Sequence, residues 1–326
     1  MKLAPIPRID ADAITDFHTQ VAAHGQPVVI SNKRGSLAAI ATWTLAELSE
    51  RFGNVKVPVR DFDDEHRQFF GNGGIRKRKM MDLAEYIHLI QTIQQRPAGQ
   101  SPAEKNQEQL PYAGNISIRQ DPAVAGKFVK LLEECRFPDW LPNDSRDEYR
   151  LWIGAVGQRS TIHNDPYHNF NAQIVGSKRF ILFAPEKHDE LYPEFFHAAM
   201  WASPVDPDAP DLAKYPKFAQ VEGYACDLQE GETLFIPRFW WHCVQALRAS
   251  VNVNRWVFSD DGRWHQQPEA RRFISYRKLV DEVKQQFESQ PEFLKDFQRE
   301  DHERLLAELR AFGSIEAAAP ELEEAH

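Results

Sequence analysis

The chain has few cysteines, no net positive charge and no long apolar run, and each of these absences excludes a class of protein. Its three cysteines, Cys135, Cys226 and Cys243, are widely spaced, so they form neither a disulfide framework nor a C-x-x-C zinc motif. No segment approaches the ~20 apolar residues of a membrane helix, and residues 1–10 lack the apolar core of a signal peptide. We therefore expect a cytoplasmic protein with reduced thiols and no membrane partner.

The charge balance is acidic, with 39 Lys and Arg against 48 Asp and Glu residues and a formal net charge of −9. Such a chain gives no support for binding to nucleic acid, and we expect no nucleic-acid partner. Hydrophobic residues make up 42% of the 326 residues, which is enough to bury a large core in a soluble domain.

A His-x-Asp motif and a distant second histidine are the features around which the chain is organised. His163 and Asp165 are two residues apart, and in an extended segment such positions point to the same side. His242 would join them from a strand far along the chain, as a β-barrel allows. Two imidazoles and one carboxylate suit non-haem Fe(II) and leave coordination positions open. Mn, Co and Zn bind such ligands too, so the motif alone does not name the metal.

The segments around this motif carry a more specific signal. Residues 169–183 read as two β-segments joined by a Gly-Ser turn, and residues 231–242 read G-E-T-L-F-I-P-R-F-W-W-H. With the upstream His-x-Asp, this pattern resembles the cupin-like JmjC family of Fe(II)- and 2-oxoglutarate-dependent oxygenases. Within that family it is similar to the asparaginyl hydroxylase that acts on hypoxia-inducible factor. The resemblance is strongest from about residue 151 to residue 258.

The resemblance implies a mainly β fold with α additions, a double-stranded β-helix also called a jelly-roll or cupin barrel. Residues 1–270 would form the oxygenase domain, with its core at about 110–260 behind N-terminal α/β elements. Residues 271–315 have apolar residues at helical spacing in two runs. Relatives form a homodimer through such a helical pair, and packing on the chain's own barrel is the alternative. The tail, 316–326, is expected to fray.

Local patterns also predict elements in front of the barrel. Residues 10–24 and 82–95 have the spacing of amphipathic helices. Another helix is expected after Thr44, because Thr44 and Glu47 fit a capping box. The polar residues 96–109 predict a mobile loop, and in this fold such a loop would cover the mouth of the site.

The resemblance assigns the chemistry to a small set of residues. It implies that His163, Asp165 and His242 hold Fe(II) as the catalytic centre, with 2-oxoglutarate and O₂ as co-substrates. The far carboxylate of 2-oxoglutarate needs a buried cation, and Lys178, fifteen residues after His163, stands at the family's lysine position. Arg179 would point to the opposite face of the strand, and a solvent-facing lysine is the alternative for Lys178.

Further residues match family positions that bind the co-substrate. Ser160 and Tyr112 would hydrogen-bond the same carboxylate as Lys178. Thr161 is an alternative donor to Ser160, and Tyr112 is equally well explained as a packed core tyrosine.

Two asparagines and two histidines near the motif complete the set of candidates. Asn169 and Asn254 match family asparagines that would orient a carboxylate through their amides, and capping of strand ends is the alternative. His168 and His188 are not expected to bind the metal.

The function implied by the resemblance is hydroxylation of an unactivated C–H bond in an amino-acid side chain of a protein or peptide. One alternative is hydroxylation of a small metabolite or a peptide natural product, and the width of the cleft beside the metal would separate these two. A non-catalytic metal-binding cupin is the other alternative. The complete ligand set with Lys178 argues against it, because a degenerate binder need not retain every part.

Overall fold

The computed structural model describes the β-rich part of the chain in most detail, and the fold is given for that part. The described residues are 1–31, 43–60, 78–95, 110–119, 124, 126–134, 137, 141, 147–197 and 200–257. The predicted loop at 96–109, the helical pair at 271–315 and the tail at 316–326 lie outside them. The chain divides into two compact units, residues 1–194 with 201–259 and residues 195–200 with 260–326. The site described below and the strands of the two sheets belong to the first unit, apart from Met200 at the start of one strand.

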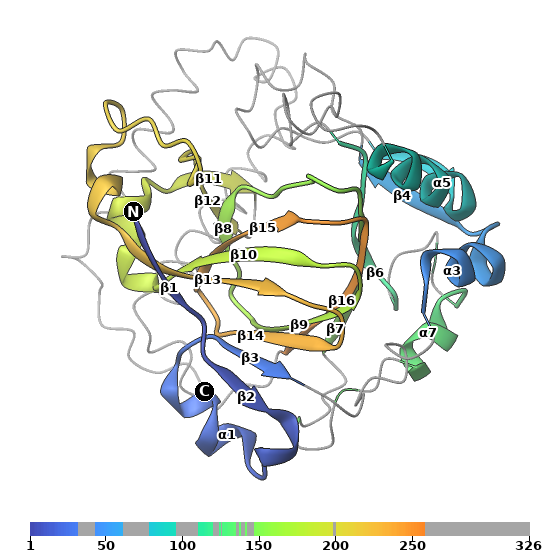
Figure 1. The fold of residues 1–326 in the computed structure, drawn as a ribbon, viewed down its shortest axis with the longest axis horizontal. Coiled ribbons are helices and arrows are strands. Elements are labelled where there is room, and N and C mark those ends of the chain that lie inside the picture. Colours follow the sequence, from blue (N-terminus) through green and yellow to red (C-terminus); the bar gives the residue numbers. More distant parts are fainter. Residues whose placement is uncertain are drawn as a thin grey trace, which may run out of the picture. The chain divides into compact units, whose positions relative to one another are not determined.

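Most of the described strands belong to two β-sheets (Figure 1). In order of pairing, the first sheet contains β1 (Lys2–Pro5), β13 (Glu222–Leu228), β10 (Lys178–Phe183), β15 (Trp241–Ala246), β8 (Ile162–Asn164) and β12 (Met200–Ser203). The second sheet contains β2 (Arg8–Asp10), β3 (Val28–Ser31), β14 (Glu232–Ile236), β9 (His168–Val175), β16 (Ser250–Val257), β7 (Glu148–Gly154), β6 (Tyr112–Ser117), β4 (Lys56–Arg60) and β5 (Arg78–Asp82). A further strand, β11 (Glu194–His197), spans the boundary between the two units.

The chain passes repeatedly from one sheet to the other. The two β-segments predicted within 169–183 are present as β9 and β10, but they do not form a hairpin. Strand β9 pairs with β14 and β16, whereas β10 pairs with β13 and β15. Gly176 allows the turn between them at φ +74°, and a Cβ there would lie 2.3 Å from the carbonyl oxygen of Ala249. This alternation between facing sheets is the jelly-roll topology that the sequence predicts.

The helices are short, and along the chain they lie between the strands. They are η1 (Ala11–Ala13), α1 (Phe17–Gln20), η2 (Ala22–His24), α3 (Leu45–Phe52), α5 (Leu83–Gln94), α7 (Val129–Glu134), η5 (Pro185–Leu191) and η6 (Pro216–Gln220). The continuous helix predicted over 10–24 is wrong, because three short pieces occupy that stretch. The side-chain oxygen of Gln20 accepts hydrogen bonds from the backbone N–H groups of Thr15 (2.8 Å) and Asp16 (2.9 Å). These bonds compete with a continuous helical ladder.

The other two predicted helices are present. Thr44 precedes α3, and its hydroxyl accepts from the backbone N–H of Glu47 at 3.0 Å. The carboxylate of Glu47 instead pairs with Nη1 of Arg51 at 3.3 Å, so the Thr44 half of the predicted capping box is the half that forms. Helix α5 corresponds to the pattern at 82–95 and buries Tyr86, Ile87 and Ile90 among other residues.

Apolar residues of β7, β9 and β16 in the second sheet pack against the helices. One core cluster joins α3, α5 and α7 to β7, β9 and β16; its strand residues include Leu151, Ile153, Ala172, Val251 and Val253. Because side chains alternate along a strand, the intervening polar residues of β9 and β16 face the space between the two sheets. This arrangement is the reason why the interior beside the first sheet contains several buried amides.

The interior between the sheets has an apolar half and a polar half. The apolar half joins β10 and β13 of one sheet to β14 of the other; it includes Phe180, Leu182, Leu228, Leu234 and Ile236. The polar half contains buried residues from β8, β9, β10, β15 and β16; they include Asp165, Asn169, Asn171, Lys178, His242, Asn252 and Asn254. The candidate site lies in this polar half.

Candidate functional site

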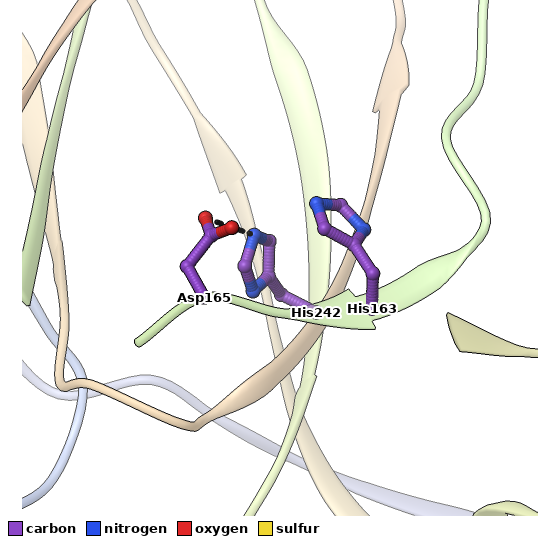
Figure 2. A group of neighbouring side chains, drawn as sticks. All are labelled: His163, Asp165 and His242. Atoms are coloured by element: carbon purple, nitrogen blue, oxygen red, sulfur yellow. Dashed lines mark ion pairs between the residues drawn. The ribbon is translucent and has the colours of Figure 1, made fainter. Parts of the chain in front are cut away.

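Strands β8 and β15 bring together the three predicted metal ligands. His163 in β8 lies opposite His242 in β15, and Asp165 follows directly after β8. Their side chains gather in one place (Figure 2), and one ligand atom from each lies within 4.8 Å of the others. Nε2 of His242 is 3.7 Å from Oδ2 of Asp165, and the two imidazole centroids are 4.3 Å apart. Within the described ranges, no other group of three His, Cys, Asp or Glu residues is close enough to hold a metal.

Backbone carbonyls orient both imidazoles toward this shared space. Nδ1 of His163 lies 2.8 Å from the carbonyl oxygen of Thr161, and Nδ1 of His242 lies 3.0 Å from that of Trp240. A carbonyl only accepts, so each Nδ1 carries the proton and each Nε2 keeps its lone pair. This is the tautomer that a metal-binding histidine needs.

The segment before β15 is fixed to Asp165 by the main chain. The backbone N–H of Phe239 donates to the carbonyl oxygen of Asp165 at 2.7 Å. Phe239 has φ +64° and is buried, so surrounding packing holds it in a conformation that a bulky residue seldom adopts. The bond places the third ligand beside the strand that provides His242.

Burial sets the charge state of these ligands. Burial, together with the neighbouring imidazole of His163, lowers the pKa of His242 to about 3, so its imidazole is neutral at physiological pH. Burial also raises the pKa of Asp165, against the opposing effects of the neighbouring His163 and Arg150. A desolvated carboxylate beside two imidazoles with available Nε2 lone pairs is a donor set that fits Fe(II).

Lys178 lies in the same interior as the metal-ligand group. It is only 2% exposed, whereas its neighbour Arg179 is exposed on the other face of β10. Its Nζ donates a hydrogen bond to Oδ1 of Asn252, and no carboxylate among the described residues forms an ion pair with it. Burial lowers the pKa of Lys178 to about 7. A buried amine with a neutral partner is suited to bind an anion.

The pairing register places Ser160 at a level along the strands between that of Lys178 and that of His242. Along β10 and β15, Lys178 is opposite Ala246, Phe180 is opposite Val244, and Leu182 is opposite His242. Ser160 contacts the middle of these pairs: its Oγ accepts from the backbone N–H of Val244 at 3.0 Å. A hydroxyl that accepts one bond still has its own proton to donate.

Tyr112 packs in the interior wall beside Trp152. Their ring centroids are 5.8 Å apart, and Tyr112 is buried. Its ring lies against two glycines: a Cβ on Gly114 would be 2.4 Å from Cε1 of the tyrosine, and one on Gly154 would be 3.1 Å from Cε2. The tyrosine therefore occupies space that exists only because these two residues lack side chains.

The two predicted asparagines contact each other. Asn254 donates through Nδ2 to Oδ1 of Asn169 at 3.1 Å, and its own Oδ1 accepts from Nε1 of Trp152 at 2.5 Å. Both asparagines are buried; Asn254 lies in the middle of β16, away from a strand end, and Asn169 is the second residue of β9.

The two histidines set aside in the sequence lie outside the metal-ligand group. Nδ1 of His168 accepts from the backbone N–H of Arg238 at 3.2 Å. The ring of His188 lies 5.7 Å from that of Trp241. Each of these histidines therefore contacts a residue of another segment and takes no part in the metal-ligand group.

Sequence reasoning missed Asn171, Asn252 and Trp152. The signal was present as strict alternation: Asn169-Phe170-Asn171-Ala172-Gln173 in β9 and Ser250-Val251-Asn252-Val253-Asn254 in β16. Such a pattern shows that one face is polar, but it does not show that the polar face is the inner one.

Comparisons with known proteins identify the family to which the chain belongs. The family model for the cupin-like domain matches residues 14–261. The chain is 29% identical over 257 residues to Jumonji C domain-containing protein 5 of Drosophila melanogaster, covering 77% of this chain and 59% of that protein. It is 28% identical over 259 residues to lysine-specific demethylase 8 of Xenopus tropicalis, covering 77% and 52%. It is also 27% identical over 220 residues to tRNA wybutosine-synthesizing protein 5 of Danio rerio, covering 66% and 64%.

The matched region thus spans between half and two thirds of the length of these relatives. Members of this cupin-like JmjC family use Fe(II) and 2-oxoglutarate, which are the cofactors predicted from the sequence, and the grouping of His163, Asp165 and His242 is compatible with iron. The jelly-roll sheets and the extent of the family match lead to one conclusion: the chain belongs to the cupin-like domain family of JmjC proteins.

Proposed function

We propose that this protein is an Fe(II)- and 2-oxoglutarate-dependent oxygenase that hydroxylates an unactivated C–H bond. The observation that carries the proposal is the buried Lys178, which shares the polar interior with His163, Asp165 and His242 and has no carboxylate partner among the described residues. Burying such an amine is unfavourable unless an anion joins it. A purely structural cupin would have no reason to keep it.

The metal would be held by Nε2 of His163, Nε2 of His242 and the carboxylate of Asp165. Bound Fe(II), together with 2-oxoglutarate, supplies the activation of O₂ that breaks an unactivated C–H bond. The protein's own share is to present the three ligands in one place, through the opposed strands β8 and β15 and the carbonyls that fix both imidazoles.

Lys178 would pair with the far carboxylate of 2-oxoglutarate, with Ser160 and Tyr112 as hydroxyl donors. The charges support a dianion: a divalent metal with Asp165 leaves one positive charge, and protonated Lys178 adds another. A dicarboxylate that spans both would neutralise the polar half of the interior. A monocarboxylate would leave one charge buried without a counter-ion.

Asn169 and Asn254 would orient the co-substrate or a ligand carboxylate through their amides. Their mutual hydrogen bond and the bond from Trp152 hold both amides in fixed positions. Fixed amides next to a metal site keep the bound groups aligned without rearrangement.

We infer that the substrate is an amino-acid side chain of a protein or peptide. This follows from the resemblance to protein hydroxylases, and the names of two relatives refer to lysine demethylation, which is also an action on protein. A small metabolite or a peptide natural product is the alternative. The name of one relative refers to tRNA, but the net charge of −9 on this chain does not favour an RNA substrate.

The test is turnover with defined substrate classes. Protein supplied with Fe(II), 2-oxoglutarate and O₂ would be incubated separately with a peptide library, a metabolite mixture and tRNA. We expect succinate release and a product heavier by one oxygen atom in the peptide arm, both abolished in Asp165→Ala and retained in His188→Ala, which changes a histidine outside the metal-ligand group. Product in the metabolite or tRNA arm would show that the substrate belongs to that class and not to peptides. Loss of a methyl group with formaldehyde release would indicate demethylation. Absence of succinate in every arm would contradict an oxygenase.

Two further proposals rest on sequence alone. Residues 271–315 would form a homodimer through their apolar helical stripes, which sedimentation of the full chain against one ending at residue 270 would test. A cytoplasmic location is the second. Among the described residues, the structure contains no helix that is long and apolar enough to span a bilayer.

A further inference from the structure

Lys178 and Asn252 form a hydrogen bond that connects the two sheets. Lys178 comes from β10 of the first sheet and Asn252 from β16 of the second, and they are both 2% exposed. Nζ of the lysine donates to Oδ1 of the asparagine. The position of the ammonium group is therefore set by a side chain on the opposite wall.

Asn171 fixes the orientation of that asparagine. Nδ2 of Asn252 donates to Oδ1 of Asn171 at 2.7 Å, and Asn171 is buried on the neighbouring strand β9. With its amide nitrogen committed to Asn171, Asn252 can present only its oxygen to Lys178. Neither asparagine is required by the metal-ligand group, and neither was singled out by sequence motifs.

The hydrogen bond between Lys178 and Asn252 lies at a defined distance along the strands from the metal-ligand group. Lys178 and Leu182 are on the same face of β10, and Leu182 is opposite His242. Four residues of a strand extend about 13 Å, so the backbone positions of Lys178 and His242 are about that far apart along the strands. A ligand that contacts both the metal and the ammonium must match the distance that remains between them.

The partner of Lys178 is also chemically suited to this task. An amide oxygen holds an ammonium group by a hydrogen bond without neutralising its charge. A carboxylate at position 252 would form an internal ion pair and remove the attraction for a ligand anion. An apolar residue would leave the lysine free to adopt other rotamers.

We propose that Asn252, oriented by Asn171, is a positioning residue that sets the depth of the Lys178 ammonium and thereby the chain length of the dicarboxylate that the pocket accepts. This inference rests on the proposed function, because it concerns the same co-substrate pocket. The hydrogen-bonded pair of Asn171 on β9 and Asn252 on β16 would therefore be the reason why the pocket prefers 2-oxoglutarate to the four-carbon oxaloacetate and the six-carbon 2-oxoadipate.

Equilibrium binding of these three 2-oxo acids under anaerobic conditions tests the inference. Affinities would be measured by calorimetry with Fe(II)-loaded wild type, Asn252→Ala, Asn252→Asp, Asn171→Ala and the exposed control Asn54→Ala. We expect Asn252→Ala to lose about tenfold in 2-oxoglutarate affinity, the scale of one hydrogen bond to a charged group, and to lose much less for 2-oxoadipate. Asn171→Ala should shift the same ratio in the same direction, and Asn54→Ala should leave it unchanged.

Asn252→Asp separates positioning from simple structural damage. It keeps the size of the side chain and supplies Lys178 with a counter-ion, and, like Asn171→Ala, it loses the hydrogen bond from position 252 to Asn171. All three acids should therefore bind at least about a hundredfold more weakly, far beyond the effect of Asn171→Ala. Undiminished binding to this variant, or an unchanged ratio between the acids in Asn252→Ala, would overturn the inference. If Asn252→Ala does not fold, the ratio in Asn171→Ala decides in the same way. Failure of wild type to bind any of the acids would instead refute the proposed function.

Discussion

Lys178 and Asn252 meet across the interior between the two sheets, and the lysine's partner there is a neutral amide. Burial without a carboxylate partner lowers the pKa of Lys178 to about 7 from its ordinary value of 10.5. The protein without co-substrate therefore carries an unfavourable charge in its interior. That unfavourable energy is available to strengthen the binding of an anion.

Replacing this lysine by an apolar residue should stabilise the protein in the absence of ligands. Between about pH 7 and 10.5 the unfolded chain binds more protons at this position than the folded one, so the lysine's contribution to stability improves as pH rises. Below pH 7 its full penalty is present. We expect Lys178→Met to be more stable than wild type by about 1–4 kcal/mol at pH 6, with the difference shrinking toward pH 10. Urea unfolding at both pH values measures this; equal stability at pH 6 would contradict it.

Affinity for 2-oxoglutarate should depend on the protonation of the same lysine. Above pH 7 the free protein loses the proton from Lys178, so binding must restore it, and affinity should fall by up to about tenfold per pH unit. Lys178→Arg keeps its charge throughout this range and should show a much flatter profile. Calorimetry from pH 6 to 9 in buffers of different ionisation enthalpy would also detect the bound proton. If the affinity of wild type for 2-oxoglutarate does not change with pH, Lys178 takes no part in co-substrate binding.

Loss of any one proposed ligand should weaken metal binding strongly. His163→Ala, Asp165→Ala and His242→Ala each remove a donor from a group whose ligand atoms lie within 4.8 Å of one another. We expect Fe(II) affinity to fall by at least about a hundredfold in each, because changes to groups that merely support ligands already cost about 10–100-fold. His188→Ala is the matched control, since His188 lies outside the group. Similar affinities for Asp165→Ala and the control would exclude Asp165 as a ligand.

The packing of Tyr112 against Gly114 gives a steric test of the tyrosine's role. A methyl group on Gly114 would lie 2.4 Å from Cε1 of Tyr112, so Gly114→Ala must displace the ring or the strand. We expect a loss of about 1–3 kcal/mol in the free energy of unfolding. If the hydroxyl binds the co-substrate, Gly114→Ala and Tyr112→Phe should both weaken 2-oxoglutarate binding. A variant Tyr112→Phe with unchanged affinity would leave the tyrosine as a packing residue only.

The central topology was predictable because it depends on motifs with a fixed spatial meaning. His163 and Asp165 share one face of an extended segment. The resemblance to the family implies a barrel strand that brings His242 to them, and this strand is β15, where His242 is opposite His163. Thr44 likewise predicts the start of α3 through a local hydrogen bond. The His163–Asp165 spacing and the Thr44 cap are both signals that lie within a few residues of the feature they predict.

The errors arose where distant contacts decide the outcome. The turn at Gly176 and Ser177 looks like a hairpin locally, but β9 and β10 find their partners in different sheets. The stretch 10–24 has helical spacing, yet the side chain of Gln20 takes the backbone N–H groups at its middle. The inward direction of Asn171 and Asn252 depends on the helices that cover the outer face of their sheet.

The account depends most on one claim, that His163, Asp165, His242 and Lys178 together bind Fe(II) and 2-oxoglutarate. Anaerobic titration of the metal-free protein with Fe(II) and then 2-oxoglutarate tests it directly, through the visible charge-transfer band of the chelate. The account predicts a saturable band in wild type, its loss in His163→Ala and a weakened band in Lys178→Met. A protein that binds Fe(II) but develops no band at any concentration of 2-oxoglutarate would contradict the account and favour a metal-binding cupin without this chemistry.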